Sequence, residues 1–334
     1  MKLAPLKIAV VAAVAAALVA GSSAAFGALR GGSASARTVK TGVVVVNTRL
    51  ATGGAAAGTG IVVASDEVLT NNHVIRGASA VRVTDPSSGR TFAATVAGYS
   101  VTRDIALLDL RNASGLRTAV IGSSGSVAVG DHLTAVGNAG GTGTLTVKRG
   151  AVIALRRSIT VSDDEGGTSR LAGLIETSAP LRPGDSGGPL IRAGRVIGID
   201  AAASTGFSFQ GGEGYAIPID TAVAIARQVD AGKKSSTVHV GATAFLGVRL
   251  GSSDFAQQPG AVVEGVAPGS PAERVGLASG EVITRFGGHR VTSATSLRNL
   301  VLRYSPGNAV KLAWVDQYTG SDSAIVRLAS GPPQ

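Results

Sequence analysis

Residues 180–190 read Pro180-Leu181-Arg182-Pro183-Gly184-Asp185-Ser186-Gly187-Gly188-Pro189-Leu190. A serine that attacks a carbonyl needs its hydroxyl exposed at a tight turn, with backbone N–H groups directed at the oxyanion that forms. The glycines around Ser186 supply the backbone angles and the close approach that such a turn requires. This stretch therefore predicts a nucleophile loop, and the strand-like run that follows it predicts a fold built from short strands.

Two earlier segments offer partners for this serine. His73 follows Leu69-Thr70-Asn71-Asn72, at the end of a predicted strand, which would project its imidazole into a cleft. Further along, Asp104 comes directly before the apolar run Ile105–Leu108. Buried there, its carboxylate could hold His73 in one tautomer and stabilise the imidazolium. The chain order is His, Asp, Ser, which differs from the orders found in α/β-hydrolases and subtilisins.

The motif Gly-Asp-Ser-Gly-Gly-Pro at 184–189 resembles the nucleophile loop of the chymotrypsin-like serine proteases. This resemblance implies a catalytic triad of His73, Asp104 and Ser186, and an oxyanion hole formed by the backbone at Gly184, Asp185 and Ser186. Other histidines and acids have less suitable settings, namely His132, His239, His289, Asp85 and Asp109.

The composition limits the possible chemistry. Of the 334 residues, 44% are hydrophobic and 16% charged, which is ample for packed cores, and the length suits two or three domains. The absence of cysteine excludes disulfides, thiolate zinc sites and cysteine nucleophiles. The net charge of +10 is scattered along the chain and no nucleic-acid motif accompanies it. We interpret the charge as solubility and non-specific attraction to anionic surfaces.

The N-terminal 29 residues have the pattern of an export signal. Lys2 and Lys7 precede an apolar run from Ile8 to Ala20, and small residues follow. Cleavage after Ala25 or Gly27 would remove this segment. Left uncleaved, it is about the ~20 residues that a membrane helix needs. Either outcome places the rest of the chain outside the cytoplasm, as a secreted or membrane-anchored protein, and residues 30–40 are predicted to be a linker.

From Thr41 onward, short Val-, Ile- and Thr-rich runs alternate with turn signals, which favours an all-β barrel or sandwich. Separate strands are predicted at 145–147 and 151–155. Residues 219–229 have apolar residues at helical spacing, with Asp220 or Thr221 as the N-cap and Gly232 beyond the end. With the resemblance, this predicts a chymotrypsin-like double β-barrel over residues 41–232, followed by a linker at 233–243.

Several segments are similar to one branch of the family, the HtrA/Deg proteases: residues 148–153, 175–179 and 214–218. Residues 136–141 are Gly-rich and lack the proline and aromatic residue usual in that branch. The resemblance places the substrate pocket at Leu181, Gly198, Ile199, Asp200 and Ala201. Since no acid occupies an obvious pocket base, small apolar residues are expected on the substrate before the scissile bond.

Residues 244–330 resemble the PDZ domain that follows HtrA proteases, which implies a small α+β fold. Phe245-Leu246-Gly247-Val248 stands where that family has its carboxylate-binding loop. Backbone N–H groups in such a turn cradle a terminal carboxylate, and the adjacent strand edge pairs with the peptide. Residues 293–302 are predicted to form the helix along that groove, with Ser293 or Thr295 near its N-cap.

Together these features predict an exported or membrane-anchored HtrA-like serine endopeptidase that cleaves misfolded or secreted envelope proteins. Its partners would be polypeptide substrates and C-terminal peptides, with no nucleic acid, and the resemblance implies no cofactor and no metal. HtrA proteases commonly form trimers through aromatic residues, but residues 30–60 contain none, which leaves the oligomeric state open. The alternative is a non-proteolytic PDZ-containing chaperone or binding protein.

Overall fold

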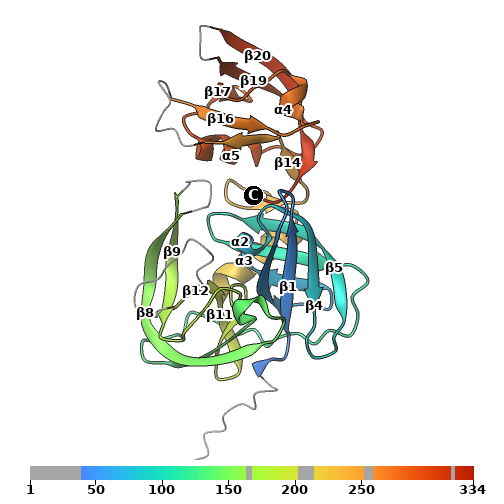
Figure 1. Ribbon diagram of the computed structural model, residues 1–334. Helices are drawn as coiled ribbons and strands as arrows, with labels where there is room; N and C mark the ends of the chain where they lie inside the picture. The colour runs from blue at the N-terminus through green and yellow to red at the C-terminus, as the bar shows by residue number, and fades with distance from the viewer. Residues whose placement is uncertain (1–38, 163–167, 202–213, 252–258, 317–319) are drawn as a thin grey trace, which may run out of the picture. The chain divides into compact units, whose positions relative to one another are not determined.

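The computed structural model describes residues 39–162, 168–201, 214–251, 259–316 and 320–334 (Figure 1). The export signal or anchor predicted for residues 1–29, and most of the linker predicted at 30–40, lie outside the described residues. Among the described helices, none has the length and apolar character needed to span a membrane.

The first β-barrel contains six antiparallel strands. They are β1 (Val43–Leu50), β2 (Ala55–Val62), β3 (Glu67–Thr70), β4 (Ala78–Thr84), β5 (Thr91–Ser100) and β6 (Ile105–Leu110). The order β5-β4-β1-β2-β3-β6 closes through a pairing of β5 with β6. In β4, Val81 and Val83 are buried while Arg82 between them is exposed, as strand alternation requires. The single-turn helix α2 (Asn72–Ile75) begins two residues after the end of β3 at Thr70.

The second barrel is also closed and six-stranded. Its strands are β7 (His132–Gly137), β8 (Thr146–Ser162), β9 (Thr168–Thr177), β10 (Pro189–Arg192), β11 (Arg195–Ala201) and β12 (Gly214–Pro218). The prediction of separate strands at 145–147 and 151–155 was wrong, because β8 runs through both. Its register against β9 shifts near Val152, Ala154 and Arg157, so bulges bend one long strand where the sequence pattern suggested two. A short 3₁₀ turn, η1 (Ala139–Gly141), follows β7.

One hydrophobic cluster joins the two barrels. It includes Val43, Ile61 and Leu69 from the first barrel and Val136 and Ile199 from the second. The barrels therefore pack against each other, and residues at the edges of this shared core come together from distant parts of the chain. Figure 1 shows the two barrels side by side, one in blue to cyan and the other in green to yellow.

Helix α3 (Ile219–Asp230) follows the second barrel and buries Ala222, Ile225, Ala226 and Val229. The predicted N-cap was wrong: Pro218 occupies the N-cap position. Asp220 instead accepts hydrogen bonds from the hydroxyls of Ser123 and Ser124, at 3.0 and 2.8 Å. The loop of Ser123 and Ser124, distant in sequence, therefore binds the carboxylate that was expected to cap α3.

The C-terminal part is a small α+β unit. It contains β14 (Thr243–Phe245), β15 (Val248–Leu250), β16 (Ala261–Val266), β17 (Val282–Phe286), β18 (His289–Arg290), β19 (Ala309–Val315), β20 (Ser321–Arg327), β21 (Ala329–Gly331), α4 (Pro271–Arg274) and α5 (Ala294–Val301). The main sheet has the order β15-β16-β17-β19-β20. Ser293 caps α5 in a capping box with Ser296, which confirms one of the two predicted caps.

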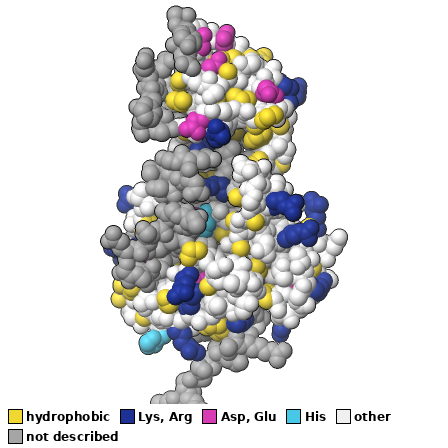
Figure 2. Space-filling model, viewed as in Figure 1, with side chains coloured by type: hydrophobic (Ala, Val, Ile, Leu, Met, Phe, Trp, Pro, Cys, Tyr) yellow, Lys and Arg dark blue, Asp and Glu magenta, His cyan; other side chains and the backbone are white. Residues whose placement is uncertain are grey.

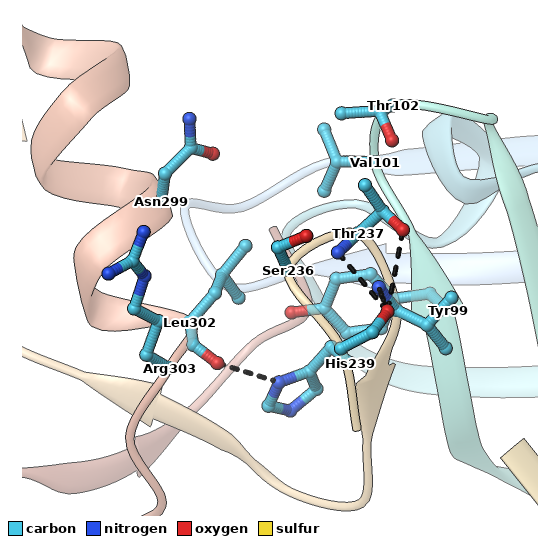
Figure 3. Close-up of a pocket in the computed structure, with 11 residues that line it drawn as sticks. Tyr99, Val101, Thr102, Ser236, Thr237, His239, Asn299, Leu302 and Arg303 are labelled. Carbon is cyan, nitrogen blue, oxygen red and sulfur yellow. Dashed lines mark hydrogen bonds between the residues drawn. The ribbon is translucent and has the colours of Figure 1, made fainter. Parts of the chain in front are cut away.

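The segment 233–243, predicted as a linker, contains a short strand. Here β13 (His239–Val240) pairs with β5 of the first barrel. The His239 ring is buried, with Nδ1 3.3 Å from the carbonyl oxygen of Leu302 (Figure 3) and its ring centroid 5.0 Å from that of Tyr99. Burial lowers the pKa of His239.

The predicted fold class, a double β-barrel followed by an α+β unit, is confirmed.

Candidate active site

His73 lies on α2, at the edge of the first barrel. Val74 and Ile75, the next two residues, are buried in the barrel core, while 26% of the His73 side chain remains exposed. Asn71 precedes the helix, and its side-chain amide donates a 2.8 Å hydrogen bond to the carbonyl oxygen of Asp104. Core packing and this bond fix both the helix and the loop opposite it, so the imidazole has a defined position.

The Asp104 carboxylate holds His73 through both of its oxygens. Oδ2 accepts a 2.8 Å hydrogen bond from Nδ1 of the ring, and Oδ1 accepts a 2.9 Å bond from the backbone N–H of His73. Asp104 has a φ of 52°, a left-handed conformation that few non-glycine residues adopt and that is frequent at functional sites. Because the proton on Nδ1 faces the carboxylate, Nε2 carries the free lone pair. Nε2 is buried without a hydrogen-bond partner among the described residues, as a general base awaiting its proton would be.

Ser186 reaches the same region from the second barrel. Its carbonyl oxygen accepts a 2.8 Å hydrogen bond from the N–H of Thr59 on β2. A side chain at Gly58 would lie 2.7 Å from the methyl groups of Val74 and 3.1 Å from the same Ser186 oxygen. Gly58 thus lets the nucleophile loop approach the helix that carries His73. The structure thus pairs His73 with Asp104 and brings the backbone of the Ser186 loop close to the helix that carries His73.

The turn before Ser186 has the geometry of a type II β-turn. The N–H of Asp185 donates a 2.9 Å hydrogen bond to the carbonyl of Arg182, Pro183 occupies the second position, and Gly184 has a φ of 95°. The Pro183 carbonyl accepts a 2.8 Å bond from the N–H of Gly140 in η1. Since a trans peptide directs its C=O and N–H to opposite sides, the Gly184 N–H points away from η1.

The turn sets Asp185 apart from the other two predicted oxyanion-hole residues, Gly184 and Ser186. The Asp185 N–H is engaged within the turn, so it is not available to a substrate. Gly184 and Ser186 remain as the candidate donors, and the Gly184 carbonyl is anchored by the hydroxyl of Thr59 at 2.7 Å. Although residues 136–141 lack the usual proline and aromatic residue, Gly140 orients the peptide between Pro183 and Gly184.

Replacement of Gly184 by alanine tests this arrangement. A Cβ there would lie 2.1 Å from the carbonyl oxygen of Asn138, and the positive φ disfavours any side chain. We expect kcat to fall about 10²–10³-fold, the effect of losing one oxyanion donor, with KM little changed. Gly194→Ala is the matched control, because Gly194 also has a positive φ but open space around it. Equal activities for the two variants would contradict the assignment.

The predicted pocket residues differ in what they can present to a substrate. Ile199, Asp200 and Ala201 on β11 all have buried side chains, so this strand would offer mainly its backbone. Leu181 is half-buried, and a side chain at Gly214 would lie 2.7 Å from its Cγ. Among the predicted pocket residues, Leu181 therefore has the side-chain surface available. Residues 202–213, which follow β11, lie outside the described residues.

Asp200 occupies an unusual environment for a carboxyl group. It is fully buried, and both of its oxygens have no hydrogen-bond partner within the described part of the chain. Burial raises the pKa of Asp200 well above its usual range, the charge of Asp185 raises it further, and Lys148 lowers it. The folded protein therefore favours a protonated Asp200.

Asp200→Asn is expected to stabilise the protein increasingly as the pH rises. An unfolded aspartate ionises near pH 4, so the wild type loses stability from there up to the raised pKa of the folded state. An asparagine does not titrate. Thermal unfolding of both proteins between pH 4 and 8 should thus show a widening difference in Tm, whereas Asp322→Asn, at an exposed position, should not. A difference that is constant with pH would contradict this prediction.

The second candidate site is the loop between β14 and β15. The carbonyl of Leu246 accepts a 2.9 Å hydrogen bond from Ala272, and that of Gly247 accepts a 2.8 Å bond from Ala267. Gly247 has a φ of 89°, and a Cβ there would lie 2.1 Å from that of Ser270. β15 is the end strand of its sheet, so its outer edge can pair with an added peptide strand.

Sequence reasoning missed Thr59 and Lys148. The Thr59 hydroxyl donates to Gly184 and accepts from the N–H of Asn138 at 2.9 Å, thereby connecting β2 to the nucleophile loop and to the end of β7. Lys148 on β8 pairs with the carboxylate of Asp185. No local pattern marks either residue, since both act on loops more than 30 positions away. The one available signal was Asp185 next to the nucleophile, because a buried carboxylate needs a compensating partner.

Comparisons with known proteins agree with this geometry. Residues 58–199 match the family model of the trypsin-like peptidase domain, and residues 244–315 match that of the PDZ domain. The chain is 36% identical over 265 residues to the periplasmic pH-dependent serine endoprotease DegQ of Escherichia coli, a match that covers 76% of this chain and 55% of DegQ. It thus spans about half the length of that relative.

Two further matches cover more of the compared protein. The chain is 32% identical over 275 residues to the serine protease Do-like HtrA of Lactococcus lactis, which covers 78% of this chain and 67% of that protein. Among solved structures, the HtrA-type protease AlgW with tripeptide matches with a TM-score of 0.51 and 26% identity, over 89% of this chain and 96% of AlgW. The chain belongs to the HtrA family of serine proteases.

Proposed function

We propose that this chain is a serine endopeptidase that acts outside the cytoplasm on misfolded or secreted envelope proteins. The observation that carries the proposal is the Asp104–His73 pair, at 2.8 Å, with Nε2 of His73 left unpartnered beside the loop of Ser186. A binding protein has no need of a buried carboxylate that orients an imidazole next to a nucleophile loop.

In the proposed reaction, the Ser186 hydroxyl attacks the scissile carbonyl while Nε2 of His73 takes its proton. The N–H groups of Gly184 and Ser186 stabilise the oxyanion of the tetrahedral intermediate. His73 then gives the proton to the leaving amine, and an acyl-enzyme remains. Water attacks this ester with His73 again as the base, which releases the acid and restores Ser186. Asp104 stabilises the imidazolium throughout.

We assign residues 41–232 to the protease domain, 233–243 to the connecting segment and 244–330 to the PDZ domain. Residues 1–29 would act as the export signal or anchor, and the periplasmic naming of DegQ supports a location outside the cytoplasm. The half-buried Leu181 and the absence of an exposed acid on β11 support a preference for small apolar residues before the scissile bond. In Figure 2, the Lys and Arg side chains on the visible face lie in several separate groups.

Digestion of an unfolded protein tests this function. Purified residues 38–334 should cleave unfolded casein into fragments whose new C-termini are mainly valine or alanine, as read by mass spectrometry. A fluorophosphonate should block the cleavage and EDTA should not. Intact casein after prolonged incubation would favour the alternative, a non-proteolytic binding protein, and charged residues at the new C-termini would contradict the specificity.

The PDZ groove should bind the C-termini of protein substrates, and Gly247→Ala tests this. Because a Cβ at Gly247 would overlap Ser270, the loop that cradles the carboxylate must move. We expect the affinity for a peptide with an apolar C-terminus to fall at least tenfold, while cleavage of a short chromogenic peptide is unchanged. Gly269→Ala is the control, since Gly269 also has a positive φ but no atom within 4 Å of a Cβ. If calorimetry gives Gly247→Ala and wild type the same affinity for the peptide, this role is contradicted.

A further inference from the structure

Lys148 forms an ion pair with Asp185, the residue that precedes the nucleophile. The Lys148 side chain is only 13% exposed and the Asp185 side chain 1% exposed, and Nζ of the lysine contacts Oδ2 of the aspartate. Taking both charges out of water is costly unless each finds its partner. The pair joins β8 of the second barrel to the residue that precedes Ser186.

The Asp185 carboxylate also closes the turn that precedes it. The same Oδ2 accepts a 2.7 Å hydrogen bond from the backbone N–H of Arg182, while the N–H of Asp185 donates to the Arg182 carbonyl. A side chain at Gly137 would lie 2.5 Å from Oδ1, so β7 leaves the carboxylate little room to move. The position of this carboxylate and the orientation of the Gly184 N–H, two residues into the turn, are therefore coupled.

A second buried carboxyl group lies beside this ion pair and offers it no positive charge. Asp200 is fully buried close enough to Asp185 and Lys148 to interact with both charges, and its own oxygens have no hydrogen-bond partner among the described residues. Without Lys148, the Asp185 carboxylate would stay buried beside another acid with its charge uncompensated. Moving out of its site would relieve this uncompensated charge and would open the turn.

We propose that Lys148 is a positioning residue for acyl transfer: its ion pair with Asp185 keeps the turn at Arg182–Asp185 closed and the Gly184 N–H directed at the oxyanion. This inference rests on the proposed peptidase function. It predicts that Lys148 acts on the transition state, where the oxyanion exists, and leaves the binding of the ground-state substrate nearly unchanged.

Lys148→Met removes the charge and keeps most of the side-chain length. We expect kcat on a short chromogenic peptide to fall about 10²-fold, as when one oxyanion donor is lost, with KM within threefold of wild type. The inhibition constant of a peptide boronate, which forms a tetrahedral adduct, should rise by a similar factor. Lys148→Arg should recover at least a tenth of wild-type kcat. Arg149→Met, at the exposed neighbouring position of β8, is the charge-matched control and should behave as wild type.

Circular dichroism and thermal unfolding establish that each variant is folded at the assay temperature. A folded Lys148→Met with kcat within threefold of wild type would overturn the proposal, as would Lys148→Arg no better than Lys148→Met. If Lys148→Met does not fold, Asp185→Asn is compared with the double variant Lys148→Met/Asp185→Asn. The double variant, with no unpaired charge, should be at least fivefold more active than Asp185→Asn, and equal activities would also overturn the proposal.

The same measurements separate this inference from the proposed function. A wild type that neither cleaves the peptide nor binds the boronate would refute the peptidase function itself. An active wild type with an equally active Lys148→Met would refute only the role of Lys148.

Discussion

Ser186→Ala is expected to lower kcat for peptide hydrolysis about 10⁶-fold, the effect of removing the nucleophile of a catalytic triad. A 10⁶-fold loss in kcat corresponds to about 8 kcal/mol of transition-state stabilisation. Ser186 is buried between Asp185 and Gly187 at a turn that approaches both Thr59 and the helix of His73. Loss of the hydroxyl therefore removes the attacking atom and leaves the surrounding turn in place.

The measurement compares initial rates on a chromogenic peptide for wild type and Ser186→Ala, with casein digestion as a second readout. Thermal unfolding should give nearly equal Tm values, because only one oxygen is removed. Ser65→Ala, in an exposed turn of the first barrel, controls for the substitution itself. Residual activity above about a hundredth of wild type would show that another residue is the nucleophile.

Asp104→Asn is expected to lower kcat about 10⁴-fold, the known scale for breaking this carboxylate–imidazole contact. The Asp104 carboxylate accepts two hydrogen bonds, from Nδ1 and from the backbone N–H of His73. An asparagine side chain has only one oxygen. If this oxygen accepts the backbone bond, the amide NH₂ faces Nδ1, which then must lose its proton, so that Nε2 becomes protonated and can no longer act as a base.

Rates from pH 6 to 9 on the same chromogenic peptide test this prediction, with KM expected to change little. Asp109→Asn is a suitable control, because Asp109 lies on the adjacent strand β6 with an exposed side chain. If Asp104→Asn and Asp109→Asn are equally active, Asp104 does not orient the base, and the contact seen at 2.8 Å is structural only.

Short motifs predicted the central residues of the proposed site, and the structure pairs two of them, His73 and Asp104. His73, Asp104 and Ser186 each stand in a local pattern, a strand end or a glycine turn, that determines where the side chain can point. The glycines at 184 and 187 signalled the positive φ values that the structure shows. Such features depend on neighbours in sequence, so one chain is enough to find them.

Features that depend on packing between distant segments could not be predicted in this way. The burial of Asp200, and its proximity to Lys148 and Asp185, follow from how β8 and β11 close the second barrel. Likewise, Asp185 was expected to contribute its N–H to the oxyanion hole, but the turn engages that N–H and uses the side chain as its anchor. The misplaced cap of α3 has the same cause, since Asp220 is engaged by a distant loop.

The proposed reaction depends on one activated serine, Ser186, beside His73 and a preformed oxyanion hole. Reaction of purified residues 38–334 with a fluorophosphonate, followed by mass spectrometry of the peptides, tests it most directly. We expect one adduct per chain, on Ser186, and labelling that is slowed at least a hundredfold in His73→Ala. No adduct, or an adduct on another residue, would contradict the claim.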